Sequence, residues 1–302
     1  MMSLPTELLN RFQELVYGQA SLRFSPGRLV GLEMKLRERV RVLGLSTYEE
    51  YYDLLLKKPA ELREFVEGIT TKETYFFRLP EQFQVLQQEI IPQVEDRLSQ
   101  ELQGRIGLGP ADRLPLRIWS SGCATGEEAY SLTMALLEGL QFPRAWAPEI
   151  LATDLSREAL LSASRGYYDK KTLHKIPADF RAKYVNFTDD GGGVVTEAIR
   201  SLVSFRVFNL RDLIQEKGRY CHLVDLAGVQ ELADFTERFD IIFCRNVMIY
   251  FDFPAQQDLV SGLFQCLKPG GYLFTGDAEL LHIYQHGFET VERKGTYFYR
   301  KP

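Results

Sequence analysis

From residue 116 onward, short β-rich runs alternate with longer segments that include helical patterns. The β-rich runs cover residues 116–119, 149–153, 203–208, 239–244 and 271–275. A strand that is followed by a crossover helix returns as a parallel neighbour, so this alternation predicts an α/β domain with a parallel sheet. Residues 288–300 alternate on both sides of Lys294-Gly295, which predicts a closing hairpin.

The N-terminal region carries helical patterns and no strand pattern. Apolar residues recur every three or four positions across 28–43, and a further helix is expected over 60–67. Between them, Ser46-x-x-Glu49 has the form of a capping box at the start of a helix. A compact all-α domain is the natural interpretation of this region.

The chain of 302 residues is long enough for two domains. Another helical pattern at 83–98 leads into a Gly/Pro-bearing stretch at 104–110, which predicts a loop or linker ahead of the first strand. We therefore predict an all-α N-terminal domain, a helical interdomain linker and an α/β domain over residues 1–72, 73–115 and 116–302, respectively.

The charge balance excludes several classes of function. The chain has 36 Lys and Arg against 41 Asp and Glu, so its net charge of −5 gives no general attraction to nucleic acid or to an anionic membrane. No apolar stretch approaches the ~20 residues that span a bilayer, and no signal-peptide pattern is present. We expect a cytoplasmic protein that neither binds nucleic acid nor inserts into a membrane.

The cysteine and histidine spacing does not indicate a metal centre. The four cysteines form no C-x-x-C pair, and His282 and His286 have no third ligand at a telling distance. We therefore expect reduced thiols and no bound metal.

A glycine-bearing turn follows the first predicted strand. Gly122 and Gly126 would let the backbone pass close to a ligand at the carboxyl end of the sheet, where open α/β sheets bind their ligands. The spacing is not G-x-G-x-x-G, and Glu127 and Glu128 would bring like charge to a pyrophosphate. This pattern disfavours nicotinamide and flavin cofactors and favours a cationic or hydroxyl-rich ligand; an ordinary βα turn without a ligand is the alternative.

Asp154 ends the second predicted strand. A carboxylate in this place can accept hydrogen bonds from two ribose hydroxyls, although Asp154 or Ser156 could instead cap the next helix. Together with the glycine turn, Asp154 indicates a nucleoside-bearing cofactor without a pyrophosphate. S-adenosylmethionine meets that description.

Three segments carry a specific resemblance. Residues 69–78, 121–130 and 239–251, the last including Cys-Arg-Asn-Val-Met-Ile-Tyr-Phe, resemble the CheR-type chemotaxis receptor glutamate methyltransferases, and the order of segments matches as well. The resemblance implies a Rossmann-like, S-adenosylmethionine-dependent methyltransferase domain behind a small all-α domain. It further implies methyl transfer to glutamate side chains of chemotaxis receptors in sensory adaptation.

The same resemblance implies the site residues. Those implied to bind the cofactor, together with Gly122 of the turn, are Thr74, Arg78, Glu127, Asp154, Asn209, Leu210, Arg245 and Asn246. Arg78 and Tyr250 are the implied catalytic residues, because either could orient the attacking carboxylate by hydrogen bonds. Each could equally be structural, and Tyr250 could simply pack beneath the edge of the sheet.

The sequence departs from the family pattern in three places. Lys72 stands where Asn is usual, Asp277-Ala278 replaces His-Ser ahead of Glu279, and the segment 211–238 is longer than the family norm, with an apparent helix over 229–235. The first two put rate and substrate preference in doubt. The long segment is either a partner surface or, as we favour, an inert surface excursion.

The expected partner is the cytoplasmic signalling domain of a chemotaxis receptor. The basic helix 28–41 could steer a Glu-rich receptor into place, or be only a solvated face. A small antiparallel insertion expected at about 184–210 could accept a receptor tail as an added strand. The sequence leaves open the receptor's identity, the oligomeric state and two alternative functions: a methyltransferase acting on another protein or a small acid, and a non-catalytic cofactor-binding module.

Overall fold

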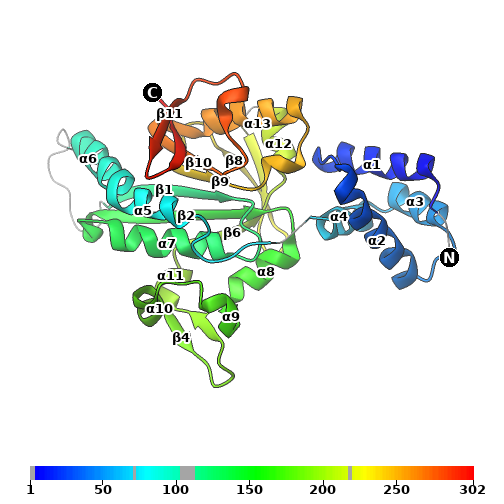
Figure 1. Cartoon of the computed structure of the whole chain (residues 1–302), viewed down its shortest axis with the longest axis horizontal. Coiled ribbons are helices and arrows are strands. Elements are labelled where there is room, and N and C mark those ends of the chain that lie inside the picture. Colours follow the sequence, from blue (N-terminus) through cyan, green and yellow to red (C-terminus); the bar gives the residue numbers. More distant parts are fainter. Residues whose placement is uncertain (1–3, 71–72, 103–112, 217–219) are drawn as a thin grey trace.

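The computed structural model describes residues 4–70, 73–102, 113–216 and 220–302. A helical domain that contains the N-terminus lies at one end of the long axis, and a larger α/β domain lies at the other (Figure 1). The expectations for Lys72 and for the 104–110 stretch fall outside the described residues. No described helix combines the length and the apolar composition needed to cross a bilayer.

The helical domain consists of α1 (Thr6–Ala20), α2 (Pro26–Val42), α3 (Tyr48–Lys57) and α4 (Pro59–Gly68). Phe12, Leu36, Tyr51 and Phe65 are fully buried where these helices meet. The helices expected over 28–43 and 60–67 are confirmed as α2 and α4. Their apolar periodicity places one face of each helix in a common core.

The capping box of α3 lies one residue later than the sequence pattern indicates. Thr47, not Ser46, is the extended N-cap residue, and its Oγ1 accepts a hydrogen bond from the N–H of Glu50 at 3.1 Å. The Glu50 carboxylate in turn accepts from the N–H groups of Ser46 and Thr47. The Ser46/Glu49 prediction was therefore wrong, because two overlapping Ser/Thr-x-x-Glu patterns compete and only one of them matches the start of the helix.

The α/β domain is built on a nine-stranded sheet with the strand order β11-β12-β10-β9-β1-β2-β6-β7-β8. The five central strands β10, β9, β1, β2 and β6 are parallel, as predicted, and the hairpin β11–β12 closes one edge. The bounds are β1 (Leu114–Ser121), β2 (Trp146–Asp154), β6 (Val203–Val207), β7 (Tyr220–Val224), β8 (Gln230–Asp234), β9 (Phe239–Cys244), β10 (Leu267–Thr275), β11 (Glu289–Arg293) and β12 (Thr296–Arg300).

Helices cover both faces of the sheet. Successive residues of β1 show this, since Ile118 belongs to the core beneath α7 and α8 while Trp119 belongs to the core beneath α12 and α13. The remaining elements of these layers are α7 (Glu127–Gly139), η2 (Pro143–Ala145), α8 (Arg157–Arg165), α11 (Glu197–Arg200), α12 (Leu210–Glu216), η3 (Met248–Tyr250), α13 (Phe253–Cys266) and η4 (Leu281–Ile283).

The expected linker is largely part of the α/β domain. After the residues that cross between the domains come α5 (Pro80–Val85), the π-helical turn η1 (Leu86–Ile90) and α6 (Ile91–Leu102). Leu86 and Ile90 are buried in the same core as α7. The helical segment therefore packs against the sheet, and the limits of the three predicted segments stay a prediction.

The small antiparallel sheet is present, with limits that differ from those expected. Its strands β3 (Tyr167–Tyr168), β5 (Gly193–Val195) and β4 (Val185–Phe187) pair in that order, with α9 (Lys170–Leu173) and α10 (Ala178–Tyr184) between β3 and β4. This insertion projects below the main sheet in Figure 1. The last part of the expected 184–210 range is β6, which joins the main sheet because it pairs with β2 in parallel.

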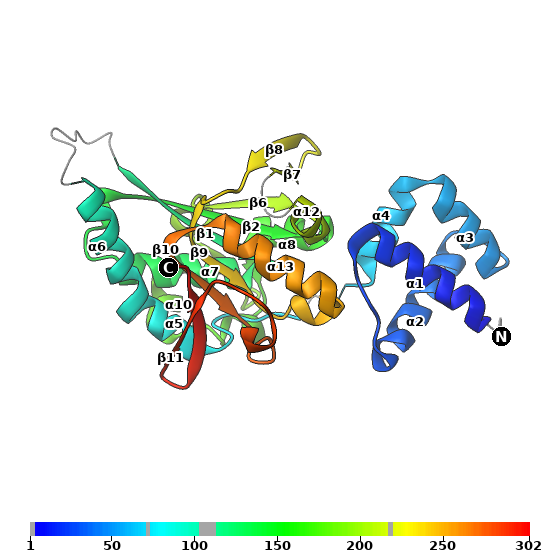
Figure 2. The same cartoon turned by 90° about the horizontal axis from the view of Figure 1, so that it is seen from above.

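The expected helix over 229–235 is wrong. These residues form β8, which pairs antiparallel with β7 at the edge of the sheet, as Figure 2 shows. A tight turn causes this pairing: Gly228 has a φ of +96°, and Asp225 Oδ1 accepts hydrogen bonds from the N–H groups of Ala227 and Val229. The long 211–238 segment is therefore largely a helix and a hairpin that extends the sheet.

Candidate functional site

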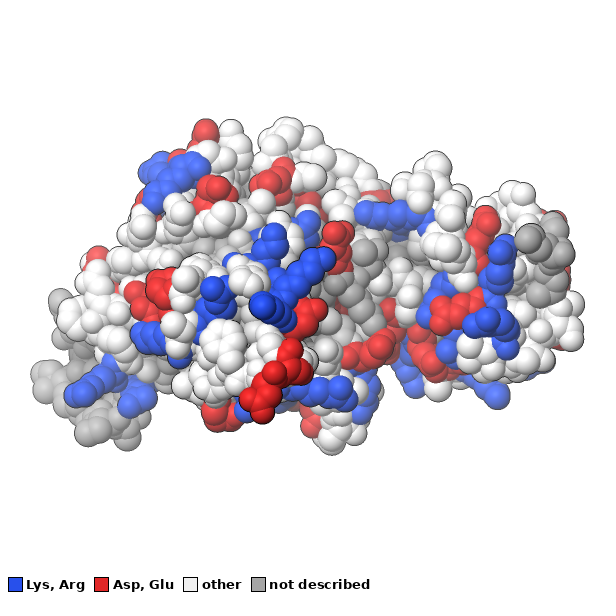
Figure 3. Space-filling model, turned by 60° about the horizontal axis from the view of Figure 1, so that its bottom comes forward, with Lys and Arg blue, Asp and Glu red and all other residues white. Residues whose placement is uncertain are grey.

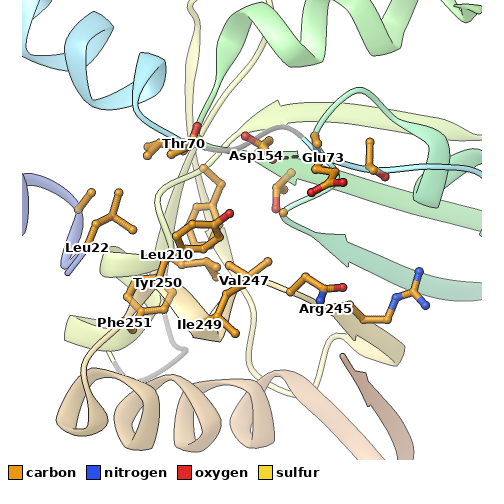
Figure 4. Close-up of a pocket in the computed structure, with 18 of the residues that line it drawn as sticks. Leu22, Thr70, Glu73, Asp154, Leu210, Arg245, Val247, Ile249, Tyr250 and Phe251 are labelled. Atoms are coloured by element: carbon orange, nitrogen blue, oxygen red, sulfur yellow. Dashed lines mark hydrogen bonds between the residues drawn. The ribbon is translucent and has the colours of Figure 1, made fainter. Parts of the chain in front are cut away.

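A cavity lies at the carboxyl ends of β1, β2 and β9, between the sheet and the helical domain. Figure 4 shows side chains of both domains around it. Nine of the ten residues predicted to form the site line it: Arg245, Thr74, Arg78, Gly122, Asp154, Asn209, Leu210, Asn246 and Tyr250. Glu127 does not line it. The strand ends thus bring together motifs that are far apart in the sequence.

The glycine turn has the backbone conformation that its composition predicts. Gly122 and Gly126 have φ values of +77° and +94°, and Ala124 between them is also left-handed at +46°. A Cβ on Gly122 would lie 2.5 Å from Cγ2 of Val247. Any side chain at position 122 would therefore both strain the backbone and displace the loop that follows β9.

Asp154 occupies the end of β2, and its carboxylate faces the glycine turn. Oδ2 accepts a hydrogen bond from the N–H of Ala124 at 2.8 Å, and Oδ1 accepts one from the N–H of Ser156 at 2.8 Å. Asp154 orders the turns on both sides and lines the cavity. The cap of α8 is Ser156, the other candidate, because its Oγ accepts a hydrogen bond from the N–H of Ala159. A carboxylate oxygen can accept more than one hydrogen bond, so these contacts leave it able to bind hydroxyl groups.

The two glutamates that open α7 point to different surroundings. Glu127 is buried, its Oε2 accepts a hydrogen bond from Thr125 Oγ1, and burial raises the pKa of its carboxyl. Glu128 lines the cavity instead, and its two oxygens accept from Ser120 Oγ and Arg245 Nε. In the first turn of α7, the Glu128 carboxylate is therefore ion-paired with Arg245, whereas the Glu127 carboxylate does not line the cavity.

Arg245 lines the cavity and connects three segments of the chain by hydrogen bonds. Its guanidinium donates to Glu128 Oε2 at 2.8 Å, to the carbonyl of Arg78 at 2.6 Å and to Gln82 Oε1 at 3.0 Å. Its side chain is 2% exposed, so the ion pair with Glu128 is buried. Arg245 thereby joins the loop after β9, the start of α7 and the segment that carries Arg78.

Glu279 is a site residue that the sequence analysis noted only as the end of a departing motif. Its buried carboxylate accepts hydrogen bonds from the N–H groups of Asn246, Ile249 and Gly276. Burial raises the pKa of this carboxyl, while the backbone donors lower it. Glu279 holds the loop that presents Asn246 and Tyr250, and no local sequence signal could have identified it.

The helical domain completes the cavity, which the sequence analysis did not predict. Ala20, Leu22 and Arg28 line it. Leu22 forms an isolated antiparallel bridge with Phe251, and Asn209 Nδ2 donates to the carbonyl of Gln19 at 2.9 Å. The helical domain therefore forms part of the cavity wall.

The cavity fits a nucleoside that carries a cation. Asp154 provides acceptors for ribose hydroxyls, and Leu210 and Phe208 provide apolar walls. The Oδ1 atom of Asn246 is buried and has no hydrogen-bond partner in the described part of the chain. An unsatisfied buried acceptor beside a cavity is costly unless a ligand supplies a donor. These features agree with S-adenosylmethionine, which carries both ribose hydroxyls and a positive charge.

Both domains match known family models. Residues 7–70 match the CheR methyltransferase all-alpha domain, and residues 72–219 and 221–296 match the CheR methyltransferase SAM binding domain. The "Chemotaxis protein methyltransferase" of Borreliella burgdorferi is 30% identical over 276 residues, which cover 90% of this chain and 88% of that protein. "Chemotaxis protein methyltransferase 2" of Vibrio cholerae is 28% identical over 96% of this chain and 91% of its own length.

A third relative is named for a different process. The "Probable biofilm formation methyltransferase WspC" of Pseudomonas aeruginosa is 32% identical over 97% of this chain, which spans only 61% of that longer protein. The predicted resemblance, fold class and cofactor are confirmed by the two family models. This chain belongs to the CheR methyltransferase family and is an S-adenosylmethionine-dependent methyltransferase.

Proposed function

We propose that this protein is a protein-glutamate O-methyltransferase that methylates glutamate side chains in the cytoplasmic signalling domain of chemotaxis receptors. One observation carries the proposal: Arg78 and Tyr250 line the same cavity as Asp154, and Arg78 has no ion pair with any carboxylate of the described residues. A guanidinium without an ion pair and a tyrosine in the same cavity are suited to bind an incoming carboxylate. Because the receptor domain is cytoplasmic, the enzyme acts in the cytoplasm.

The chemistry requires orientation more than proton transfer. S-adenosylmethionine supplies a methyl group bonded to a positively charged sulfur. A glutamate carboxyl, with an ordinary pKa of about 4.3, is already ionised at neutral pH, so no general base is needed. Arg78 and Tyr250 would align the carboxylate through hydrogen bonds, and the apolar side chains of Leu22 and Phe251 would exclude water.

The proposed cofactor residues divide by chemistry. Asp154 would accept the ribose hydroxyls, Asn209 and Leu210 would flank the adenine, and Thr74 would contact the cofactor from the interdomain segment. Asn246 would use its unsatisfied Oδ1. Glu127 would act from outside the cavity lining, and Arg245, which lines the cavity, would act through its hydrogen bonds to protein groups.

Asp154→Ala should weaken the binding of S-adenosylhomocysteine, measured by calorimetry, by one to two orders of magnitude. Loss of a pair of charge-assisted hydrogen bonds is worth about 1.5–3 kcal/mol, which corresponds to this range. Asp225→Ala is the matched control, because Asp225 also accepts backbone N–H groups in a turn but lies outside this cavity. Equal affinities of the two variants would remove Asp154 from the cofactor site.

The decisive test of function is methyl transfer to the receptor. Labelled S-adenosylmethionine is offered to the cognate receptor's signalling domain, and the incorporated label should be released by mild alkali, as an ester is. Label that resists alkali would point to methylation of another atom. Label that enters a different protein would favour the alternative suggested by the biofilm-related relative. Cofactor binding without any transfer would favour a non-catalytic module.

Two surfaces are proposed for receptor docking: helix 28–41, now within α2, and the small antiparallel sheet. The basic character of α2 is weaker than the sequence indicates, because Arg39 forms ion pairs with Glu61 at 2.6 Å and Glu64 at 2.7 Å. Figure 3 accordingly shows acidic and basic side chains intermixed over the helical domain. Arg37 and Arg41 remain exposed and carry the proposed attraction to an acidic receptor helix.

Charge reversal of both Arg37 and Arg41 to Glu should raise the KM for the receptor about tenfold, because repulsion replaces steering. The affinity for S-adenosylhomocysteine should not change, since neither residue lines the cavity. Charge reversal of Lys57 and Lys58, two exposed lysines at the junction of α3 and α4, serves as the control for net charge. If the Arg37/Arg41 variant has a normal KM for the receptor at physiological salt, this face of α2 does not bind the receptor.

A further inference from the structure

We infer that Arg28, contributed by the helical domain, is a positioning residue for Tyr250. The inference rests on the proposed function, in which the Tyr250 hydroxyl orients the substrate carboxylate. Arg28 lies in the first turn of α2, is half-buried and lines the cavity. It is separated from Tyr250 by more than two hundred residues of sequence, so no local motif connects the two.

The Arg28 side chain makes two contacts with the Ile249–Tyr250 segment. Its guanidinium carbon lies 4.3 Å from the centroid of the Tyr250 ring, which is the distance of a cation–π contact. Its Nη1 donates a hydrogen bond to the carbonyl of Ile249 at 2.9 Å. One side chain therefore holds both the ring of Tyr250 and the backbone immediately before it.

The backbone around Tyr250 is otherwise held at its ends. The N–H of Arg23 donates to the Tyr250 carbonyl at 2.8 Å, and Leu22 bridges to Phe251. The Glu279 carboxylate holds the N–H of Ile249 from within the α/β domain. These contacts set the path of the backbone. Among the described residues, only Arg28 makes an aromatic or cation–π contact with the Tyr250 ring.

The arrangement has a consequence for catalysis. A ring that is free to change its rotamer carries its hydroxyl several ångströms, whereas in-line transfer tolerates misplacement of about 1 Å at a cost of up to a hundredfold in rate. A stacked guanidinium restricts the ring without touching the hydroxyl. Arg28 therefore makes the activity of Tyr250 depend on the docked helical domain.

The test compares four variants of the full-length protein. Arg28→Ala should lower kcat for receptor methylation about tenfold, with the KM for S-adenosylmethionine within about twofold of the wild type. Arg28→Lys should recover part of the loss, because lysine keeps the cation but not the planar fork. Arg11→Ala removes an arginine that stacks on Tyr52 at 4.1 Å, away from the cavity, and should leave kcat unchanged.

Arg23→Ala separates positioning from domain docking. The Arg23 side chain approaches Asp252 of the α/β domain at 3.6 Å but does not reach the Tyr250 ring, and its backbone N–H survives the substitution. If Arg23→Ala lowers kcat as much as Arg28→Ala, loosening of the domains explains the effect and the inference is wrong. A smaller effect of Arg23→Ala supports it.

Two further measurements address Tyr250 directly. In a Tyr250→Phe background, Arg28→Ala should add less than its own tenfold loss, because both changes remove the same oriented hydroxyl. With 3-fluorotyrosine at position 250 and no cofactor present, Arg28→Ala should shift and broaden the fluorine resonance. Fully multiplicative losses or an unchanged resonance would overturn the inference. An inactive wild type would instead contradict the proposed function.

Discussion

Arg245→Met should lower the free energy of unfolding by about 3–5 kcal/mol, the cost of breaking a buried ion pair by removal of one partner. The substitution keeps an apolar side chain of similar length but leaves the Glu128 carboxylate, whose side chain is 10% exposed, without its cation. It also removes the donors to the Arg78 carbonyl and to Gln82. Urea denaturation of the purified variant measures the loss.

Arg117→Met is the control for this substitution. Arg117 pairs with Glu149 at the same 2.8 Å, yet the two side chains are 35% and 52% exposed, so the pair is worth at most about 1 kcal/mol. The two arginines thus differ mainly in burial. If both variants unfold at the same urea concentration, Arg245 is not the connecting residue that its contacts indicate.

The Arg245 variant should also lose methyl transfer. The carbonyl of Arg78 is held by Arg245 Nη1, so the segment that presents the Arg78 side chain loses an anchor. A stable but inactive Arg245→Met protein would show that the ion pair serves positioning alone. A stable and fully active one would remove Arg245 from both roles.

Tyr250→Phe should reduce kcat about ten- to a hundredfold while the melting temperature barely moves, because only one hydroxyl is lost and the ring keeps its packing. Arg78→Lys should cost a similar factor, since lysine retains charge but loses the paired donors of the guanidinium. Steady-state methylation of the receptor measures both. Tyr284→Phe is the matched control, because its hydroxyl contacts Gln256 and lies outside the cavity.

The double variant distinguishes shared from separate roles. If Arg78 and Tyr250 align one carboxylate, their combined loss should be smaller than the product of the single losses. A strictly multiplicative loss would assign Arg78 to the cofactor. Full activity of Tyr250→Phe would leave Tyr250 as a packing residue.

The parallel sheet could be predicted because its information is local. Each β-rich run is a short apolar segment, and each intervening helix has its own periodicity, so strand and helix identity follow from neighbouring residues. Local information is also why the run at 229–235 was wrongly assigned as a helix. Its apolar residues fit either a helix or a strand, and pairing with β7 decided between them.

The cofactor side of the site was predicted for a topological reason. Motifs that follow different parallel strands must meet at one edge of the sheet, so Gly122, Asp154 and Asn246 come together once the strands are assigned. The sequence thereby determined the domain types, the cofactor and nine of the residues that line the cavity.

Only the tertiary structure decided which charges are available and which side chains support the site. Arg39 looks like part of a basic helix until α4 brings Glu61 and Glu64 against it. Arg28 and Glu279 carry no local signature of a site, yet they hold the Ile249–Tyr250 segment from opposite domains. Such contacts depend on how helices pack within a domain and on how the two domains dock, and both bring together residues whose separation along the chain leaves no pattern in the sequence.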